Sequence, residues 1–217
     1  MMKIFILLIF TSFFYISCHV EPYITLPDYK EFIENRTLLI TPVKNTILKS
    51  SKEINDVFGD GNSSDIYVKF FQNNFEDILS RISSFSKIES LPLADSVDLR
   101  AMEFVIPGND TTYFYLPADS KIIHNKNGIN PDFILFISRL EVCPSWIDVE
   151  YGQLPNVRHT LYYLFWDNHS AKVVCYGRAN HIDGAIEKNR ETFSLWIDNL
   201  AKSLIENTPF RKKRNQW

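Results

Sequence analysis

The chain has 217 residues, of which 45% are hydrophobic and 23% charged, and its formal net charge is −3. Seventeen Phe, ten Tyr and four Trp exclude a disordered chain, because a solvated segment does not carry so many large apolar side chains. The slightly acidic balance gives no support to nucleic-acid binding. The length suits one domain with a single buried core.

The first eighteen residues have the pattern of an export signal. Lys3 gives a positive head, residues 4–15 form an apolar run broken by Thr11 and Ser12, and the segment ends at Cys18. The run is too short for a membrane-spanning helix, so we expect residues 1–17 to be removed as a signal peptide. The alternative is a plain secretory signal that leaves Cys18 as an ordinary thiol.

Tyr15-Ile16-Ser17-Cys18 resembles the lipobox of bacterial lipoproteins. The resemblance implies that Cys18 becomes the first residue and carries fatty acyl chains such as palmitate, which anchor the protein to a membrane of the cell envelope. Two or more chains hold a protein stably at a bilayer, whereas one chain does so only marginally. In that family, His19 after the cysteine favours the outer membrane over the inner membrane, with the folded part in the periplasm.

Residues 18–36 have a mixed composition with many polar residues and contain Pro22 and Pro27, which predicts a tether. A single globular domain is expected over residues 37–207, followed by a basic tail at 208–217. The run Arg211–Arg214 is interpreted as a solvated terminus, or alternatively as a patch that touches anionic lipid or glycan.

Periodicity predicts the elements of this domain. Apolar residues at helical spacing indicate an early helix at 65–84 and an amphipathic C-terminal helix at 184–207. Short apolar or alternating runs indicate strands. In chain order the expected elements are strand 37–41, a short helix near 50–58, helix 65–84, strand 87–91, a hairpin of 102–106 and 113–116, strand 132–142, a hairpin of 159–165 and 171–176, and helix 184–207. This order predicts an α+β fold, a two-layer or three-layer sandwich with a mixed, mostly antiparallel sheet packed by these two helices.

The same order resembles a family of envelope lipoproteins that includes the activators of penicillin-binding proteins and the curli-secretion lipoprotein. Pro131-Asp132 opening a strand, the hairpin around Asp167 and the helix from Gly184 carry the resemblance, with a second helix expected at 93–100. It implies docking onto another envelope protein, such as a peptidoglycan-synthesis enzyme or a secretion assembly.

Candidate reactive residues are few. Cys143 and Cys175 either form a disulfide or remain buried thiols. The histidines lack the spacing of a zinc site, although His169 with Asp167 and His181 with Asp183 are i, i+2 pairs that a weak metal site would accept. The five histidines are His19, His124, His159, His169 and His181. Asp148 and Glu150 have the same spacing and are candidate acid–base groups. We find no catalytic motif and expect neither a metal nor a small-molecule cofactor.

An aromatic run crosses the second hairpin. Alternation puts Tyr162, Leu164 and Trp166 on one face and Tyr163 and Phe165 on the other. If helices cover one face, the other needs either a second helix layer or a partner. Tyr163, Phe165 and Trp166 are therefore candidates for a surface that binds a protein or a glycan.

The leading hypothesis is a lipid-anchored bacterial envelope protein with a non-catalytic binding or assembly role and a protein partner. One alternative is a periplasmic-side hydrolase that uses Asp148, Glu150 or the histidines. Another is a secreted eukaryotic glycoprotein, because N-x-S/T sequons occur. The sequons begin at Asn35, Asn62, Asn109 and Asn168.

Overall fold

The computed structural model describes residues 23–212, except residues 30, 44, 50, 60, 61, 109, 119–121, 150, 184–188 and 207. The predicted signal peptide, the lipidation residue Cys18 and the last five residues lie outside the described part.

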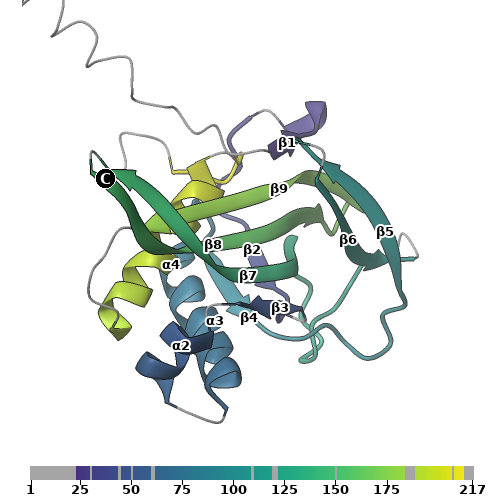
Figure 1. The fold of residues 1–217 in the computed structure, drawn as a ribbon. Helices are drawn as coiled ribbons and strands as arrows, with labels where there is room; N and C mark the ends of the chain where they lie inside the picture. Colours follow the sequence, from purple (N-terminus) through teal and green to yellow (C-terminus); the bar gives the residue numbers. More distant parts are fainter. Residues whose placement is uncertain are drawn as a thin grey trace, which may run out of the picture.

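The centre of the molecule is a mixed seven-stranded sheet, and the α+β prediction is confirmed (Figure 1). The strand order is β1–β9–β8–β7–β2–β4, and β3 also pairs with β7. The short strands are β1 (Tyr23–Thr25), β2 (Thr37–Ile40), β3 (Thr46–Leu48) and β4 (Lys87–Ser90), and the long strands are β7 (Phe133–Val149), β8 (Gly152–Asp167) and β9 (Lys172–Asp183). β2 is parallel to β4 and β7, and β3 is parallel to β7, whereas the other pairs are antiparallel.

Helices cover one face of this sheet (Figure 1). They are α2 (Ser51–Phe58), α3 (Ser63–Ile82) and α4 (Arg190–Glu206). Their apolar residues recur every three or four positions, so each helix buries one stripe. In α3 this stripe includes Phe71 and Phe75, and in α4 it includes Phe193, Trp196 and Leu200, all almost completely buried. The helices expected at 50–58, 65–84 and 184–207 are thus confirmed, although residues 184–188 lie outside the description and α4 begins at Arg190.

A β-hairpin, not a second helix layer, covers the other face. β5 (Leu99–Ile106) and β6 (Asp110–Pro117) form a separate two-stranded sheet. Phe114 and Leu116 of the hairpin pack with Ile134, Leu164 and other residues of the sheet in a second hydrophobic cluster. The fold therefore has three layers: helices, sheet and hairpin.

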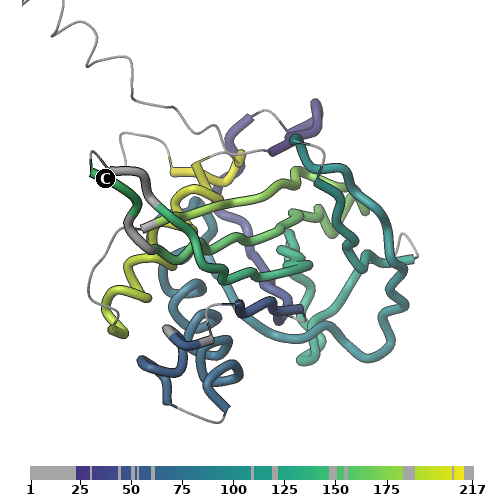
Figure 2. Tube along the Cα trace, viewed as in Figure 1, coloured from purple at the N-terminus to yellow at the C-terminus, as the bar shows by residue number. Residues whose placement is uncertain are grey.

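Two predicted boundaries were wrong. The expected tether at 18–36 overlaps the domain, because β1 pairs with β9, the 3-10 turn η2 (Pro27–Tyr29) follows, and the Ile33 amide donates to the Pro209 carbonyl at 3.0 Å. The expected tail begins too early, since Phe210 is completely buried. Figure 2 shows the purple segment after β1 beside the yellow segment after α4. Each segment supplies a backbone partner for the other, which sequence periodicity does not reveal.

The second helix expected at 93–100 is also absent from the described chain. Leu93 forms an isolated bridge with Asn125, a turn follows at Asp95 and Ser96, and β5 begins at Leu99. This extended connection leads from the sheet to the hairpin and borders the cavity described next.

Candidate binding cavity

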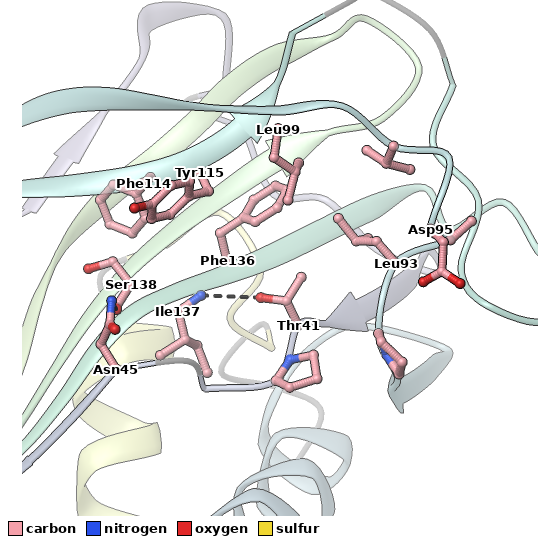
Figure 3. Close-up of a pocket in the computed structure, with 14 residues that line it drawn as sticks. Thr41, Asn45, Leu93, Asp95, Leu99, Phe114, Tyr115, Phe136, Ile137 and Ser138 are labelled. Atoms are coloured by element: carbon pink, nitrogen blue, oxygen red, sulfur yellow. Dashed lines mark hydrogen bonds between the residues drawn. The ribbon is translucent and has the colours of Figure 1, made fainter.

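A cavity of about 300 Å³ lies between the hairpin and the sheet (Figure 3). Its apolar wall is made by the 93–99 connection, by β6 and by β7. These residues are Leu93, Val97, Leu99, Phe114, Phe136 and Ile137. Cavities of this size are at the lower end of those that hold small ligands or the side chains of a partner.

The cavity lies at a break in the hydrogen-bond ladder of β7. β2 pairs with β7 at residues 133–135, and β3 pairs with it at residues 140–142, so neither covers the residues between. Thr41 and Asn45 fill the break. The Ile137 amide donates to Thr41 Oγ1 at 3.4 Å, and Asn45 Nδ2 donates to the Ser138 carbonyl at 3.3 Å. Buried backbone groups need such partners, so these two polar residues satisfy the Ile137 amide and the Ser138 carbonyl where the ladder is interrupted.

A polar cluster fixes the tip of the hairpin to the sheet. Asp110 accepts hydrogen bonds from Tyr162 Oη at 2.5 Å and from Arg178 Nη1 at 3.0 Å. The Arg139 guanidinium lies over the Tyr162 ring at 4.1 Å. Burial opposes ionisation of Asp110, but the Tyr162 hydrogen bond and the Arg178 charge outweigh it and hold the pKa of Asp110 below its usual value.

The outer face of the hairpin presents exposed aromatic side chains, and one of them borders the cavity. Strand β6 alternates, so Phe114 and Leu116 face the sheet while Tyr113 and Tyr115 face outward. Tyr113 is 55% exposed, Tyr115 is 48% exposed and Val105 of β5 is 56% exposed. Tyr115 also lines the cavity. The apolar surface therefore continues from the cavity onto the outer face of the hairpin.

The chemistry of the cavity suits binding. Asp95 is the one carboxylate among its described lining residues, which include no His, Cys, Lys or Arg. Figure 3 shows Asp95 at one end of the cavity and Asn45 with Ser138 at the other. A nucleophile paired with a base is the usual signature of covalent catalysis, and the described lining does not contain one. An apolar group with a hydrogen-bond donor or a positive charge would fit this lining.

Comparisons with known proteins do not assign a family. No protein-family model matches the sequence, and no curated protein matches it. Among solved structures, a dodecamer of a PelC variant from Paraburkholderia phytofirmans is similar at 6% identity, with 84% of this chain and 94% of that chain covered and a TM-score of 0.38. A likeness this remote supports no argument about fold or function.

The predicted aromatic surface was wrong. Tyr163 and Phe165 point toward the helices and are at most 1% exposed, while Trp166 is 8% exposed beneath the hairpin. The predicted alternation of faces is correct, but both faces are covered, so all three residues belong to the core. The exposed aromatic side chains beside the cavity come instead from β6.

The predicted thiol pair is not bridged. Cys143 and Cys175 are free. Strand β8 separates them, with Cys143 opposite Arg158 and Cys175 opposite Phe165. A disulfide requires Cα atoms within about 7 Å, and two positions on non-adjacent strands at different heights do not meet this requirement.

The candidate acid–base and metal residues do not converge. Asp148 lies opposite Gln153 near the β7–β8 turn, far along the strand from the cavity, and Glu150 is outside the described residues. In the described chain, no group of three or more His, Cys, Asp and Glu residues is arranged to hold a metal ion.

Four of the histidines have separate surroundings, and His19 is outside the described residues. His169 Nε2 lies 3.0 Å from Asp132 Oδ1, and His181 Nε2 lies 3.3 Å from Asn199 Nδ2. His124 is exposed, and His159 is completely buried among aromatic rings. The side chain of Asp183 is not described, so its predicted pairing with His181 stays a prediction.

The sequon at Asn168 is not accessible. Its side chain is 1% exposed, accepts from the Ile123 amide and donates to the Ile123 and Pro131 carbonyls. A glycan on this nitrogen would require local unfolding. Asn109 is outside the described residues.

Proposed function

We propose that this protein is a lipid-anchored protein of the bacterial cell envelope that binds a partner polypeptide without catalysing a reaction. The lipobox-like sequence ending at Cys18 supports the anchor. The observation that carries the binding role is the cavity beneath the hairpin, which offers apolar surface and polar ends but lacks paired reactive groups among its described residues. In the part of the chain that the structure describes, no helix is long and apolar enough to span a membrane.

A polypeptide partner is favoured over a small molecule by the surface around the cavity. Tyr115 and Tyr113 extend the apolar surface from the opening onto the outer face of the hairpin. Contiguous exposed apolar surface with aromatic residues is typical of protein interfaces. A partner would insert one apolar side chain into the cavity and cover the outward-facing tyrosines.

The binding role is tested by filling the cavity. Val97→Trp places a large side chain in the cavity, whereas Ile66→Trp makes a similar change at an exposed position of α3, on the opposite side of the sheet. After crosslinking in native membranes, the polypeptide captured by the tagged protein should decrease at least about tenfold with Val97→Trp, the effect of losing one buried anchor. Ile66→Trp should retain most of the capture.

Both variants should unfold at similar urea concentrations to the parent, which shows that the loss is not a loss of folding. Equal capture by parent and Val97→Trp would exclude the cavity as the binding site. The anchor is tested separately by the mass of the native mature N-terminus, which should begin at Cys18 with acyl chains attached. An unmodified Cys18 would exclude the anchor.

A further inference from the structure

The two ends of the described chain meet on one face of the molecule, and this face has its own chemistry. β1 begins at Tyr23, and the segment after α4 ends at Lys212. The Ile33 amide donates to the Pro209 carbonyl, and Ser83 forms a bridge with Arg211. A shallow hollow of about 260 Å³ lies between the two segments and is lined by Tyr23, Phe32, Glu206 and Arg211 among others.

Aromatic and basic side chains are exposed together on this face. Tyr23 is 37% exposed and Phe32 is 42% exposed. The Arg211 guanidinium lies over the Phe32 ring at 4.9 Å, and Lys212 Nζ donates to the Arg81 carbonyl. In the sequence, Lys213 and Arg214 follow directly. Exposed aromatic rings beside basic residues are the combination found where proteins contact the surface of a bilayer.

The length of chain before β1 brings this face to the membrane. Only five peptide units separate Cys18 from Tyr23, so a lipid on Cys18 would be at most about 18 Å from the start of β1 even if the connection were fully extended. Strands β9 and β8 lie between β1 and β7. The face at β1 is therefore the side nearest the anchor, and the cavity on β7 lies toward the other edge of the sheet.

We infer that the face formed by Tyr23, Phe32, Arg211 and Lys212 docks onto an anionic phospholipid surface. The inference rests on the proposed lipid anchor. Basic residues near a bilayer interact with anionic headgroups, and lipid chains plus a basic patch hold a protein more firmly than the chains alone. Docking would also fix the orientation of the domain, with the cavity directed away from the bilayer.

The test removes the lipid and measures what the face contributes. The mature chain, residues 18–217 with Cys18→Ser, contains every residue that the structure describes. It is mixed with vesicles of phosphatidylcholine alone or with added phosphatidylglycerol, and cosedimentation is measured. We expect binding only to the vesicles that contain phosphatidylglycerol, and binding that weakens as salt screens the charges.

Charge variants locate the contact. Replacing Arg211 and Lys212 by Glu should weaken binding by at least about thirtyfold, since each basic residue near an anionic surface contributes about fivefold. The matched control replaces Lys69 and Lys126 by Glu, which changes the net charge equally at exposed positions remote from this face. Glu206→Lys should strengthen binding about fivefold or more, and Phe32→Ser should weaken it.

The inference would be overturned if the control pair weakened binding as much as the Arg211 and Lys212 pair. It would also be overturned if the protein bound neutral and anionic vesicles equally, or bound neither kind. These failures are separable from failure of the proposed anchor. If the native protein is acylated at Cys18 but the Cys18→Ser chain does not bind anionic vesicles, the proposed anchor stands and the docking inference fails.

Discussion

The two faces of the central sheet are covered in different ways. On one face, α3 and α4 lay continuous stripes of large side chains against β7, β8 and β9, and aromatic rings pack directly on one another. On the other face, the β5–β6 hairpin packs only part of its inner surface and leaves a cavity beside Phe114. The helix-covered face thus holds the larger hydrophobic core, whereas the hairpin-covered face holds the proposed binding cavity.

The largest expected effect compares the same substitution on the two faces. Phe75→Ala removes a ring that stacks on the Phe71 ring, with 5.1 Å between the ring centroids. It should lower the free energy of unfolding by about 3–5 kcal/mol. Phe114→Ala should cost about 2–3 kcal/mol, because Phe114 already borders a cavity and its neighbours can relax into the space. Urea unfolding measures both. Equal costs would contradict the distinction between the faces.

The second prediction concerns a titrating group within the helix-covered face. His159 lies 5.0 Å from the Trp196 ring, with both ring nitrogens buried and without a hydrogen-bond partner among the described residues. Burial, reinforced by the charge of nearby His181, lowers the pKa of His159 from 6.5 to about 3. The unfolded chain therefore takes up a proton below pH 6.5 that the folded chain does not accept until about pH 3.

The free energy of unfolding should accordingly fall as the pH is lowered through this window, by up to about 1.4 kcal/mol per pH unit. At pH 5 the loss relative to pH 7 is about 2 kcal/mol. Urea unfolding at a series of pH values measures the slope, and His159→Phe should reduce it by this amount. A slope that is unchanged in His159→Phe would assign the effect to other groups.

The third prediction concerns the attachment of the hairpin. Asp110→Asn removes the negative charge that interacts with Tyr162 and Arg178, and it should lower the free energy of unfolding by about 1 kcal/mol. The effect is small because the Asp110 and Arg178 side chains are about a third exposed and solvent screens the pair. Hydrogen exchange of the β5 and β6 amides should become faster, while exchange in α3 should not change. Asp98→Asn is the control, since Asp98 and its partner Arg100 are both exposed.

The pH dependence of this attachment has a defined sign. The folded state lowers the pKa of Asp110. The contribution of Asp110 to the free energy of unfolding is therefore fully present above the ordinary carboxyl pKa, and it is lost as the pH falls through the pKa of the folded state. Acidification should therefore loosen the hairpin through Asp110, and Asp110→Asn should abolish that part of the change.

The smallest expected effect concerns the thiols. Because Cys143 and Cys175 are free, dithiothreitol should change the free energy of unfolding by less than about 0.5 kcal/mol. Burial raises the pKa of the Cys175 thiol, so it should resist alkylation by iodoacetamide in the folded protein, whereas the half-buried Cys143 reacts first. Mass spectrometry of alkylated peptides distinguishes them, and a mass loss of two hydrogens would reveal a disulfide instead.

Much of the layered fold was predictable because its signals are local. Helices α3 and α4 follow from apolar residues at helical spacing, and the central strands follow from apolar or alternating runs. The two faces of Tyr162–Trp166 were also assigned correctly by alternation. The extent of the strands was underestimated, since β7, β8 and β9 continue into polar segments where hydrophobicity no longer marks them.

The cavity could not be predicted, because it depends on contacts between segments far apart in the sequence. Strands β2 and β3 both pair with β7 and leave residues between them uncovered, and no local pattern announces a gap in a ladder. The outward aromatic residues had a usable signal, since the alternation in Thr111–Leu116 puts Tyr113 and Tyr115 on the face opposite Phe114. Residues 113–116 were predicted to be a strand, but the exposed surface was predicted at the richer aromatic run Tyr162–Trp166, where the abundance of rings reflects packing in the core.

The break in the β7 ladder also bears on how this domain can change over generations. The connection from Thr41 to Asn45 bounds the cavity, and of its described residues only the partly buried Val43 packs against the large hydrophobic cluster. Insertions or deletions there would reshape the proposed binding cavity while leaving the helix packing intact. Descendants of one ancestral gene could therefore acquire new specificities through a single short loop, without first finding compensating mutations elsewhere.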